Sequence, residues 1–566
     1  MNRNYTHHNL FRSLLMLVLS LCFALTACEA IPPLEPEPSP EPAQPTLTRP
    51  TALPTPTPEP TPEPITVFYS DNIPGELTAE LSLPSDLLLV DNPEQADLLV
   101  DLSAKDAEAV SYQVYALAAP FFTIQDDISL AELRTTLSSK TEDENAPFSA
   151  LTSQIDDQLL RSLIDANNPG RLSIQKSAPD LSDQFGTVWT ILPFEELSHE
   201  LKVISIDGIS PLDENFDPTD YALALPIAIH LNTEKTIEPE ILTTLMPQSN
   251  YHRDQMTSLI MTGVTAMARK TAFAMSELGH MRSGTYIRDF MRAADITHIS
   301  NEVSFFEDCP YPDPDYDGFL FCSDPAYMEL LVDLGTDVVE LTGNHNNDVR
   351  ALYKVDTVPY SLDLYEKNHM QYYAGGTNLE NSKQPVKIEH NGNKIAFVGC
   401  NSYGPEMAWA TEDSSGSAPC EDWEWIKQSI KDLKEEGYLP IVTLQFQEDD
   451  LYTATSQAIR DFRPLADAGA VIVNGSQSHV GKALEFRDDA IIHYGLGNLF
   501  FDQVGYYITY DSFIQKHFFY QGRHISTQLN TITVEETALP RFMTSEERSK
   551  FLTNIFLASE ELRRQP

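Results

Sequence analysis

Residues 337–348 read DVVELTGNHNND, an apolar run that gives way to a loop of polar side chains. The run Asp337–Leu341 predicts a short buried strand, because turn-forming residues bound it on both sides. Asn344, His345 and Asp348 follow it directly. Residues that follow parallel strands meet at one edge of a sheet, where ligands usually bind. The stretch therefore predicts both a strand of an α/β sheet and part of a functional site.

Apolar runs of the same kind recur on both sides of this stretch and alternate with helical patterns. In one predicted helix, Asp422–Gly437, the residues Ile426, Ile430 and Leu433 make one apolar face. Alternating strands and helices predict a layered α/β domain, here over residues 251–535. Its other predicted strands are Leu259–Thr262, Ile296–Ser300, Lys394–Val398, Leu439–Leu444, Ala470–Val473 and Ala490–Tyr494.

Carboxylate, carboxamide and imidazole side chains follow successive predicted strands. Together these groups suit divalent ions such as Mn, Fe or Zn. Structural roles are the alternative: Asn344 would cap the next helix, Glu302 would pair with a cation, and His479 would be an ordinary surface histidine. The candidate metal ligands are Glu302, Asn344, His479, Gln477 and Gln445.

In order and spacing, the motifs within residues 259–502 resemble those of the capsule-synthesis CapA family. This family is associated with poly-γ-glutamate capsules and is similar in fold to the calcineurin-like metallophosphoesterases. The resemblance implies that His345 is a catalytic acid that protonates a leaving oxygen, and that Asp348 orients its ring. The motifs are Asn301-Glu302, Gly343-Asn344-His345 with Asp348, Gly475-x-x-x-His479 and Gly495-Leu496-Gly497-Asn498-Leu499-Phe500.

The chain departs from the family pattern at three expected ligand positions. Val264 stands where the family has its first metal carboxylate, unless Thr265 replaces it. Gln445 and Gln477 stand where the family has histidines, and a carboxamide does not replace imidazole toward a metal such as zinc. The candidate ligands then carry little negative charge for two divalent ions. We therefore expect a degraded metal site.

Three functions follow from this resemblance and its departures. The first is a part in the synthesis, anchoring or trimming of a capsular, poly-γ-glutamate-type extracellular polymer, with hydrolysis weak or lost. The second is an active metal-dependent hydrolase of a phosphoester or an amide. The third is a solute- or polymer-binding module without catalysis. Expected partners are the capsular polymer or its synthesis machinery, and the membrane through a lipid anchor.

The first residues of the chain read as an export signal. Ser13–Ala27 is an apolar stretch that is too short to span a bilayer, and Leu25-Thr26-Ala27-Cys28 resembles the bacterial lipobox. We expect a lipoprotein signal peptide over residues 1–27 and a lipidated Cys28. Residues 28–64 are rich in proline and predict an extended polyproline II linker. The alternatives are an ordinary signal peptide and a proline-rich ligand for another domain.

These features place the protein outside the cytoplasm, at the bacterial cell surface and lipid-anchored to the membrane. The 84 acidic and 37 basic residues give a formal net charge of −47, which excludes nucleic acid as a partner held through its phosphates. Four cysteines lie in the body of the chain, and an exported protein favours disulfides. The simplest of three pairings joins Cys309 to Cys322 and Cys400 to Cys420. We expect the first pair to close a loop beside the pocket.

Residues 65–250 predict a smaller α/β domain. It resembles, weakly, the two-lobed solute-binding proteins of the cell envelope, and a structural spacer is the alternative. Residues 536–566 predict a C-terminal helical tail, because Thr544-Ser545-Glu546-Glu547 is a capping-box sequence before an apolar stripe. Predicted strands of the smaller domain are Ile65–Tyr69, Ala96–Leu102, Tyr112–Ala118, Val188–Leu192 and Val203–Ile206.

Overall fold

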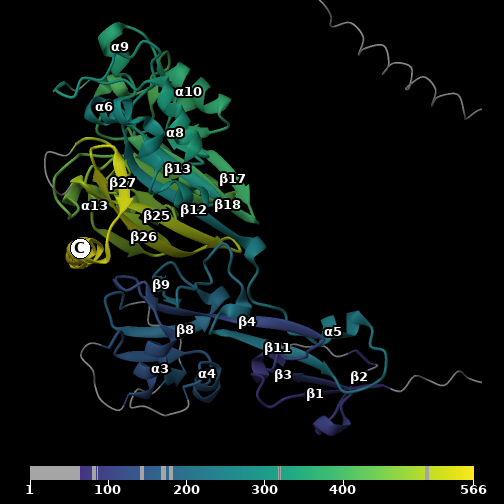
Figure 1. Ribbon diagram of the computed structural model, residues 1–566. Helices are drawn as coiled ribbons and strands as arrows, with labels where there is room; N and C mark the ends of the chain where they lie inside the picture. Colours follow the sequence, from purple (N-terminus) through teal and green to yellow (C-terminus); the bar gives the residue numbers. More distant parts are fainter. Residues whose placement is uncertain are drawn as a thin grey trace, which may run out of the picture. The chain divides into compact units, whose positions relative to one another are not determined.

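The fold is that of a computed structural model (Figure 1). The structure describes residues 64–565 except 79–83, 86, 140–145, 167–173, 177–182, 317, 319 and 504–508. The predicted signal peptide over 1–27, Cys28 and the proline-rich linker up to residue 63 lie outside the described residues. Within the described ranges, no helix combines the length and the apolar character that crossing a bilayer requires.

The first sheet of the large domain contains the strand predicted from residues 337–341, now β14. Its strands β12 to β15 are parallel, and those from β25 onward are antiparallel. A further strand, β24 (Asn498–Phe500), pairs with β12. Across the sheet the order is β15 (Gln371–Tyr373), β14 (Val338–Glu340), β13 (Ile296–Asn301), β12 (Met256–Thr265), β25 (Asp511–Tyr520), β26 (Arg523–Glu535) and β27 (Leu539–Phe542).

The second sheet is built from the later predicted strands. Its four central strands are parallel, so their carboxyl ends lie at one edge. In the two innermost strands, β20 and β21, every residue but one is buried, as expected for strands that are covered on both faces. The order is β17 (Val386–His390), β18 (Asn393–Asn401), β20 (Leu439–Gln445), β21 (Ile472–Asn474), β23 (Ala490–His493) and β22 (Leu484–Arg487).

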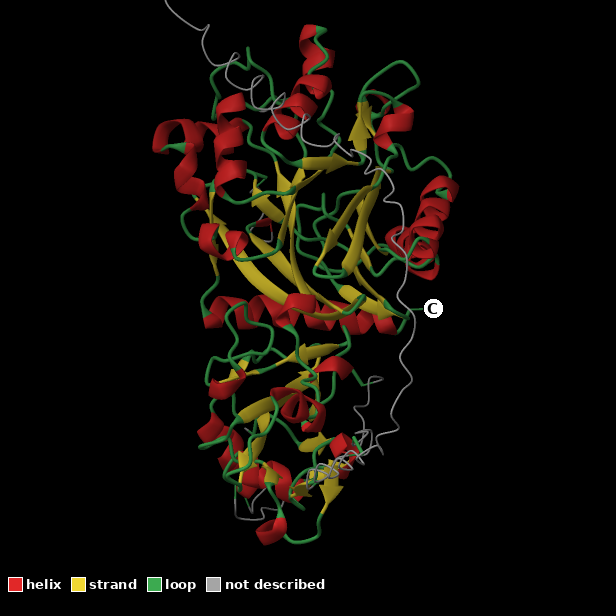
Figure 2. Ribbon diagram, turned by 90° about the vertical axis from the view of Figure 1, so that its right-hand side faces the viewer, coloured by secondary structure: helices red, strands yellow, loops and turns green. Residues whose placement is uncertain are grey.

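The two sheets pack face to face and helices cover their outer faces. Leu259 and Val338 of the first sheet share one buried core with Ile395 and Ile441 of the second. Figures 1 and 2 show helices on both sides of the strands. The predicted layered α/β fold is therefore confirmed. The covering helices are α6 (Arg269–Leu278), α8 (Met328–Asp333) and α10 (Val358–Lys367) on the first sheet, and α12 (Glu424–Glu435) and α13 (Ser456–Asp467) on the second.

Two predicted helices occur as expected. In α12 the predicted face of Ile426, Ile430 and Leu433 is buried. The chain ends in α14 (Ser545–Arg563), where Thr544 and Glu547 form the predicted capping box. The apolar stripe of α14, which begins at Phe551, packs into the core between the sheets. Shorter helices of this domain are α7 (Arg288–Arg292), α9 (Asp348–Tyr353) and α11 (Leu379–Ser382).

The smaller domain is organised by two long antiparallel strands, β4 (Ala109–Pro120) and β11 (Ala224–Leu231). Strand β11 contributes to two separate apolar cores, one that contains Val67 and one that contains Trp189, and β4 contributes to the second. All five predicted strands of this domain coincide with observed strands. The other strands are β1 (Ile65–Tyr69), β2 (Leu87–Leu89), β3 (Leu98–Asp101), β5 (Asp127–Ile128), β6 (Ala150–Ser153), β7 (Ile174–Lys176), β8 (Val188–Pro193), β9 (Leu201–Val203) and β10 (Ser205–Ile206). The α-helices are α2 (Gly75–Thr78), α3 (Leu130–Ser138), α4 (Asp157–Leu163) and α5 (Pro239–Leu245).

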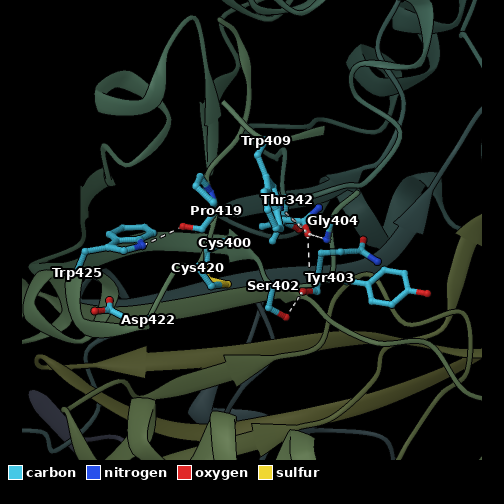
Figure 3. The surroundings of a disulfide bond; sticks show 12 residues. Thr342, Cys400, Ser402, Tyr403, Gly404, Trp409, Pro419, Cys420, Asp422 and Trp425 are labelled. Atoms are coloured by element: carbon cyan, nitrogen blue, oxygen red, sulfur yellow. Dashed lines mark hydrogen bonds between the residues drawn. A yellow bond between two sulfur atoms is a disulfide. The ribbon is translucent and has the colours of Figure 1, made fainter. Parts of the chain in front are cut away.

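Both predicted disulfides are present. Cys309 is bonded to Cys322 and Cys400 to Cys420, with sequence separations of 13 and 20 residues. Figure 3 shows the second bond, which ties β18 to the segment before α12. Beside it, the Trp425 Nε1 donates a hydrogen bond of 3.0 Å to the Pro419 carbonyl. The Cys400–Cys420 disulfide thus fixes the position of the segment that leads into α12.

We expect that replacing Cys400 and Cys420 together by serine lowers the free energy of unfolding by about 3 kcal/mol, because the bond closes a loop in the unfolded chain. Urea titration of the oxidised proteins measures the change. The double replacement of Cys309 and Cys322 is the matched control for loss of a disulfide, and we expect a similar loss there. Equal stability of wild type and the 400/420 variant would contradict the prediction.

Candidate metal centre

The strand ends of the two sheets bring the predicted site residues together. Glu302 follows β13 of the first sheet, and Asn344 lies in the loop after β14. His479 lies in the loop after β21 of the second sheet, and Glu448 in the loop after β20. Asn344, Glu448 and His479 line one cavity of about 580 Å³. The site therefore lies where both sheets present their carboxyl ends.

The centre of the site is formed by Glu302, Glu448 and His479. One ligand atom from each lies within 4.8 Å of the others. The His479 Nε2 is 3.5 Å from the Glu448 Oε2. Glu302 is fully buried, and neither of its carboxylate oxygens has a hydrogen-bond partner among the described residues. Burial of a carboxylate costs free energy unless a cation compensates it, so this donor set fits a divalent ion.

Asn498 orients the imidazole of His479. The His479 Nδ1 lies 2.8 Å from the Asn498 Oδ1, and the Asn498 Nδ2 donates to the Thr509 carbonyl at 3.1 Å. A fixed partner at Nδ1 leaves Nε2 as the ligand atom, the usual arrangement around a metal-binding histidine. Burial alone would lower the pKa of His479, but Glu448 and Glu302 beside it raise the pKa to about 9. The site thus stabilises positive charge.

The predicted carboxamide ligands lie buried at the strand ends. Gln477 donates from Nε2 to the Ser300 Oγ at 2.5 Å, and its Oε1 has no partner among the described residues. The side-chain oxygen and nitrogen of Gln445 are both buried without a described partner, and so is the Asn344 Oδ1. Of the three, only Asn344 is among the described residues that line the cavity. Gln445 and Gln477 therefore stay predictions as ligands.

His345 and Asp348 form the pair that the resemblance implies. The His345 Nδ1 lies 2.6 Å from the Asp348 Oδ2, which also accepts a hydrogen bond of 2.8 Å from the Phe321 backbone. Burial would lower the pKa of His345, but the bond to Asp348 and the nearby Glu302 raise it. The ring thus has one nitrogen held and the other left for the cavity. Both residues line that cavity.

The loop closed by Cys309 and Cys322 contributes to the wall of the site, as predicted. Leu320 and Phe321 line the cavity. Val264, at the place of the family's first carboxylate, packs with Phe321 and Phe501 in a small apolar cluster. It therefore supplies no ligand, in agreement with the sequence. The hydroxyl of the next residue, Thr265, is buried without a described partner.

Glu448 is a candidate ligand that the sequence motifs do not indicate. The family motif aligns Gln445 with a histidine at the end of β20, which draws attention away from the acidic residue three positions later. Burial would raise the pKa of Glu448, but His479 beside it lowers the pKa overall. With Glu448, the cluster carries two carboxylates rather than one. The signal that was available is an acidic side chain in the loop directly after a parallel strand.

A second buried carboxyl, Glu340, lies at the end of β14 behind the site. Burial raises the pKa of Glu340 from 4.5 to about 7, against hydrogen bonds from Ser476 and Thr342 that lower it. The Ser476 Oγ donates at 2.6 Å, and the His298 Nε2 is 3.7 Å from the other carboxyl oxygen. A carboxyl with a raised pKa in the folded state stabilises the fold while it is protonated. That contribution is lost as the pH rises from 4.5 to about 7.

We therefore expect Glu340→Gln, which stays neutral, to flatten the pH dependence of stability. Between pH 5 and pH 8 the wild type should lose about 3 kcal/mol of unfolding free energy that the variant keeps. Urea titrations at the two pH values measure this difference. The control is Glu412→Gln at an exposed position, which should follow the wild type. Parallel pH dependence of wild type and Glu340→Gln would contradict the prediction.

Two face-to-face sheets covered by helices thus place carboxylate and imidazole side chains at their strand ends, an arrangement that suits metal-dependent chemistry. Residues 258–503 match the family model described as bacterial capsule synthesis protein PGA_cap. This match and the curated relatives described below support the CapA capsule-synthesis family for this part of the chain, as the motifs in the sequence indicate.

Two curated proteins that are similar to this chain have names that refer to PGA or capsule biosynthesis. The chain is 24% identical over 275 residues to the PGA biosynthesis protein CapA of Bacillus subtilis, across 48% of this chain and 70% of that protein. It is 29% identical over 196 residues to the capsule biosynthesis protein CapA of Bacillus anthracis, across 34% of this chain and 46% of that protein. Among solved structures, the NAD nucleotidase of Haemophilus influenzae is similar at 9% identity, across 53% of this chain and 55% of that one, with a TM-score of 0.29.

Proposed function

We propose that the large domain is a metal-dependent hydrolase that binds one divalent ion through Glu302, Glu448 and His479. The observation that carries this proposal is the approach of their three ligand atoms to within 4.8 Å, with both oxygens of buried Glu302 unpartnered among the described residues. Two carboxylates and one imidazole suit Mn, Fe or Zn. Asn344 lines the same cavity as Glu448 and His479 and supplies a further oxygen.

The side chains around this centre suit hydrolysis of a phosphoester or an amide. A divalent ion held by Glu302, Glu448 and His479 would supply Lewis-acid activation of a phosphoryl or carbonyl oxygen. His345 holds its proton toward the cavity and donates it to the leaving oxygen or nitrogen, because Asp348 fixes the other ring nitrogen at 2.6 Å. Phe321 packs against the His345 ring with centroids 4.4 Å apart and keeps water from one face of it.

We place this activity in the synthesis, anchoring or trimming of a capsular polymer at the bacterial cell surface. The match of residues 258–503 to the capsule-synthesis family model supports this role, and the names of the two Bacillus relatives agree with it. Lipidation at Cys28 would tether the protein to the membrane. The proline-rich residues 28–64 would then link that anchor to the rest of the chain.

A second candidate is a capsule-assembly protein in which the metal site has lost hydrolysis. Val264 favours this alternative, because it places an apolar side chain where the family has a carboxylate and packs into an apolar cluster. Gln445 and Gln477, in place of histidines, weaken the ligand set for a second ion further. In this case the protein binds its metal without turnover.

Turnover by the purified full-length chain separates the two candidates. The protein is stripped of metal, reloaded in turn with Mn²⁺, Fe²⁺ and Zn²⁺, and assayed on a chromogenic phosphodiester and on a γ-glutamyl amide. We expect hydrolysis that one of the metals restores and that chelation removes. Glu412→Gln, exposed and distant in sequence from the ligands, is the control that should keep full activity. Bound metal without turnover on either substrate would favour the second candidate.

A further inference from the structure

Arg269 is a fixed cation beside the metal centre that the proposed chemistry does not use. It is the first residue of α6 and lines the same cavity as Glu448 and His479. Its φ of +48° lies in the left-handed region, which an arginine rarely adopts. Backbone of this kind persists only where the surroundings hold it, and it is concentrated at binding and catalytic sites.

Two aromatic rings and one carboxylate hold the guanidinium in place. Its central carbon lies 4.8 Å from the ring centroid of Phe321 and 4.8 Å from that of Phe501. Asp502 accepts hydrogen bonds through one oxygen from the Arg269 Nε at 3.0 Å and Nη2 at 2.5 Å. These bonds do not use the Nη1 amino group. The plane of the guanidinium is therefore fixed, with a donor left beyond those that serve Asp502.

The same two rings contact the two histidines of the site. Phe321 packs against His345 with centroids 4.4 Å apart, and Phe501 packs against His479 at 5.1 Å. Arg269 thus lies in a stack of planar groups between the proposed catalytic acid and the proposed metal ligand. Its position is coupled to both, so a charged group of the substrate held by Arg269 lies within reach of the centre.

We propose that Arg269 forms an oxyanion subsite that binds a phosphoryl oxygen of the substrate. The inference rests on the proposed function and adds a specificity-determining residue to it. A chain with a net charge of −47 repels anions, so an anionic substrate needs a local cation at its site. A tetrahedral phosphoryl group has oxygens on several sides and contacts the centre and Arg269 together, whereas a planar carboxylate has two oxygens in one plane.

Arg269 also leaves room for the rest of a substrate. It lines a second cavity, of about 310 Å³, together with Tyr311, Tyr316 and Tyr353. A molecule whose phosphoryl group lies at Arg269 can therefore extend away from the metal centre along an aromatic wall. Tyrosine faces of this kind suit the apolar side of an organic group.

Calorimetric titration of inorganic phosphate into the full-length chain tests the subsite, with Mn²⁺ present and again after chelation. Arg269→Lys keeps the charge and loses the planar stack. The double variant Arg269→Gln/Asp502→Asn removes the charge without leaving Asp502 unpaired. In both variants we expect the Kd for phosphate to rise at least about ten-fold, the loss of a hydrogen bond to a charged group. Metal content should stay that of the wild type.

Lys270→Gln is the matched control, because it removes one positive charge from the exposed neighbouring residue. Its Kd for phosphate should stay within about two-fold of the wild type. Unchanged phosphate affinity in both Arg269 variants would overturn the proposal, and so would acetate binding as tightly as phosphate. The chelated arm separates this inference from the proposed function: loss of affinity there supports the subsite even if the protein shows no metal-dependent turnover.

Discussion

Glu448→Gln should lower the affinity for Mn²⁺ by at least about 100-fold. Replacement of a group behind a metal ligand already costs 10–100-fold in affinity, and this change neutralises a ligand itself. The site would keep one carboxylate, Glu302, beside the imidazole of His479. Carboxylate ligands hold divalent ions far more strongly than carboxamides do, because the charge supplies most of the attraction.

The change keeps the shape of the side chain, so folding is not expected to suffer. Metal content after dialysis against a metal buffer, read by mass spectrometry, gives the affinity. Glu302→Gln should give a loss of the same size, and Glu412→Gln none. Full metal occupancy in both variants would contradict the assignment of Glu302 and Glu448 as ligands.

His345→Ala should lower kcat for the phosphodiester by about 10²–10⁴-fold while the metal content stays unchanged. The reason is geometric: His345 lies outside the group of three ligands and is held by Asp348 at 2.6 Å with its ring at the cavity. Loss of the acid slows departure of a poor leaving group more than that of a good one. The measurement is therefore a pair of substrates whose leaving groups differ in pKa.

Asp348→Asn is the companion variant, since it keeps the shape of the partner but changes which ring nitrogen of His345 carries the proton. It should lower kcat by a smaller factor. If His345→Ala loses its metal along with its activity, then His345 acts as a ligand and the assignment of the acid is wrong. Equal losses on both substrates would point to a positioning role instead.

Much of the fold follows from local pattern alone. Each predicted strand overlaps an observed one, because a short, continuous apolar run between turn residues is typical of a buried strand. The capping box of Thr544 and Glu547 and the stripe that begins at Phe551 define α14 before any tertiary contact is known. The disulfides follow from the spacing of the cysteines, because joining the nearest cysteines along the chain closes the shortest loops and costs the least loop-closure entropy.

The rest depends on contacts that no local pattern carries. Strands β25 and β26 are absent from the prediction, although together they continue the first sheet beyond β12. Strand β11 is also absent from the prediction, although Leu225 and Ile227 within it belong to the two separate apolar cores of the smaller domain. A sequence pattern shows the periodicity of one segment, whereas the order of strands in a sheet depends on pairing and packing between segments far apart in the sequence.

The candidate site divides in the same way. Glu302, His345 and His479 stand out because each follows a strand within a recognisable motif. Glu448 belongs to the group only because the irregular segment after β20 turns its side chain toward His479. Arg269 is held at the site by Phe321 and Phe501, which lie far from it in the sequence, so no local pattern indicates its position.

The most direct test is anomalous diffraction at the manganese edge from crystals of the full-length protein grown with Mn²⁺. We expect one peak within ligand distance of the Glu302 and Glu448 carboxylates and the His479 Nε2. A second peak beside it would show that the site holds two ions despite Val264, Gln445 and Gln477. No peak at these three residues, at an Mn²⁺ concentration that saturates a known site, would contradict the metal centre on which the proposed hydrolase depends.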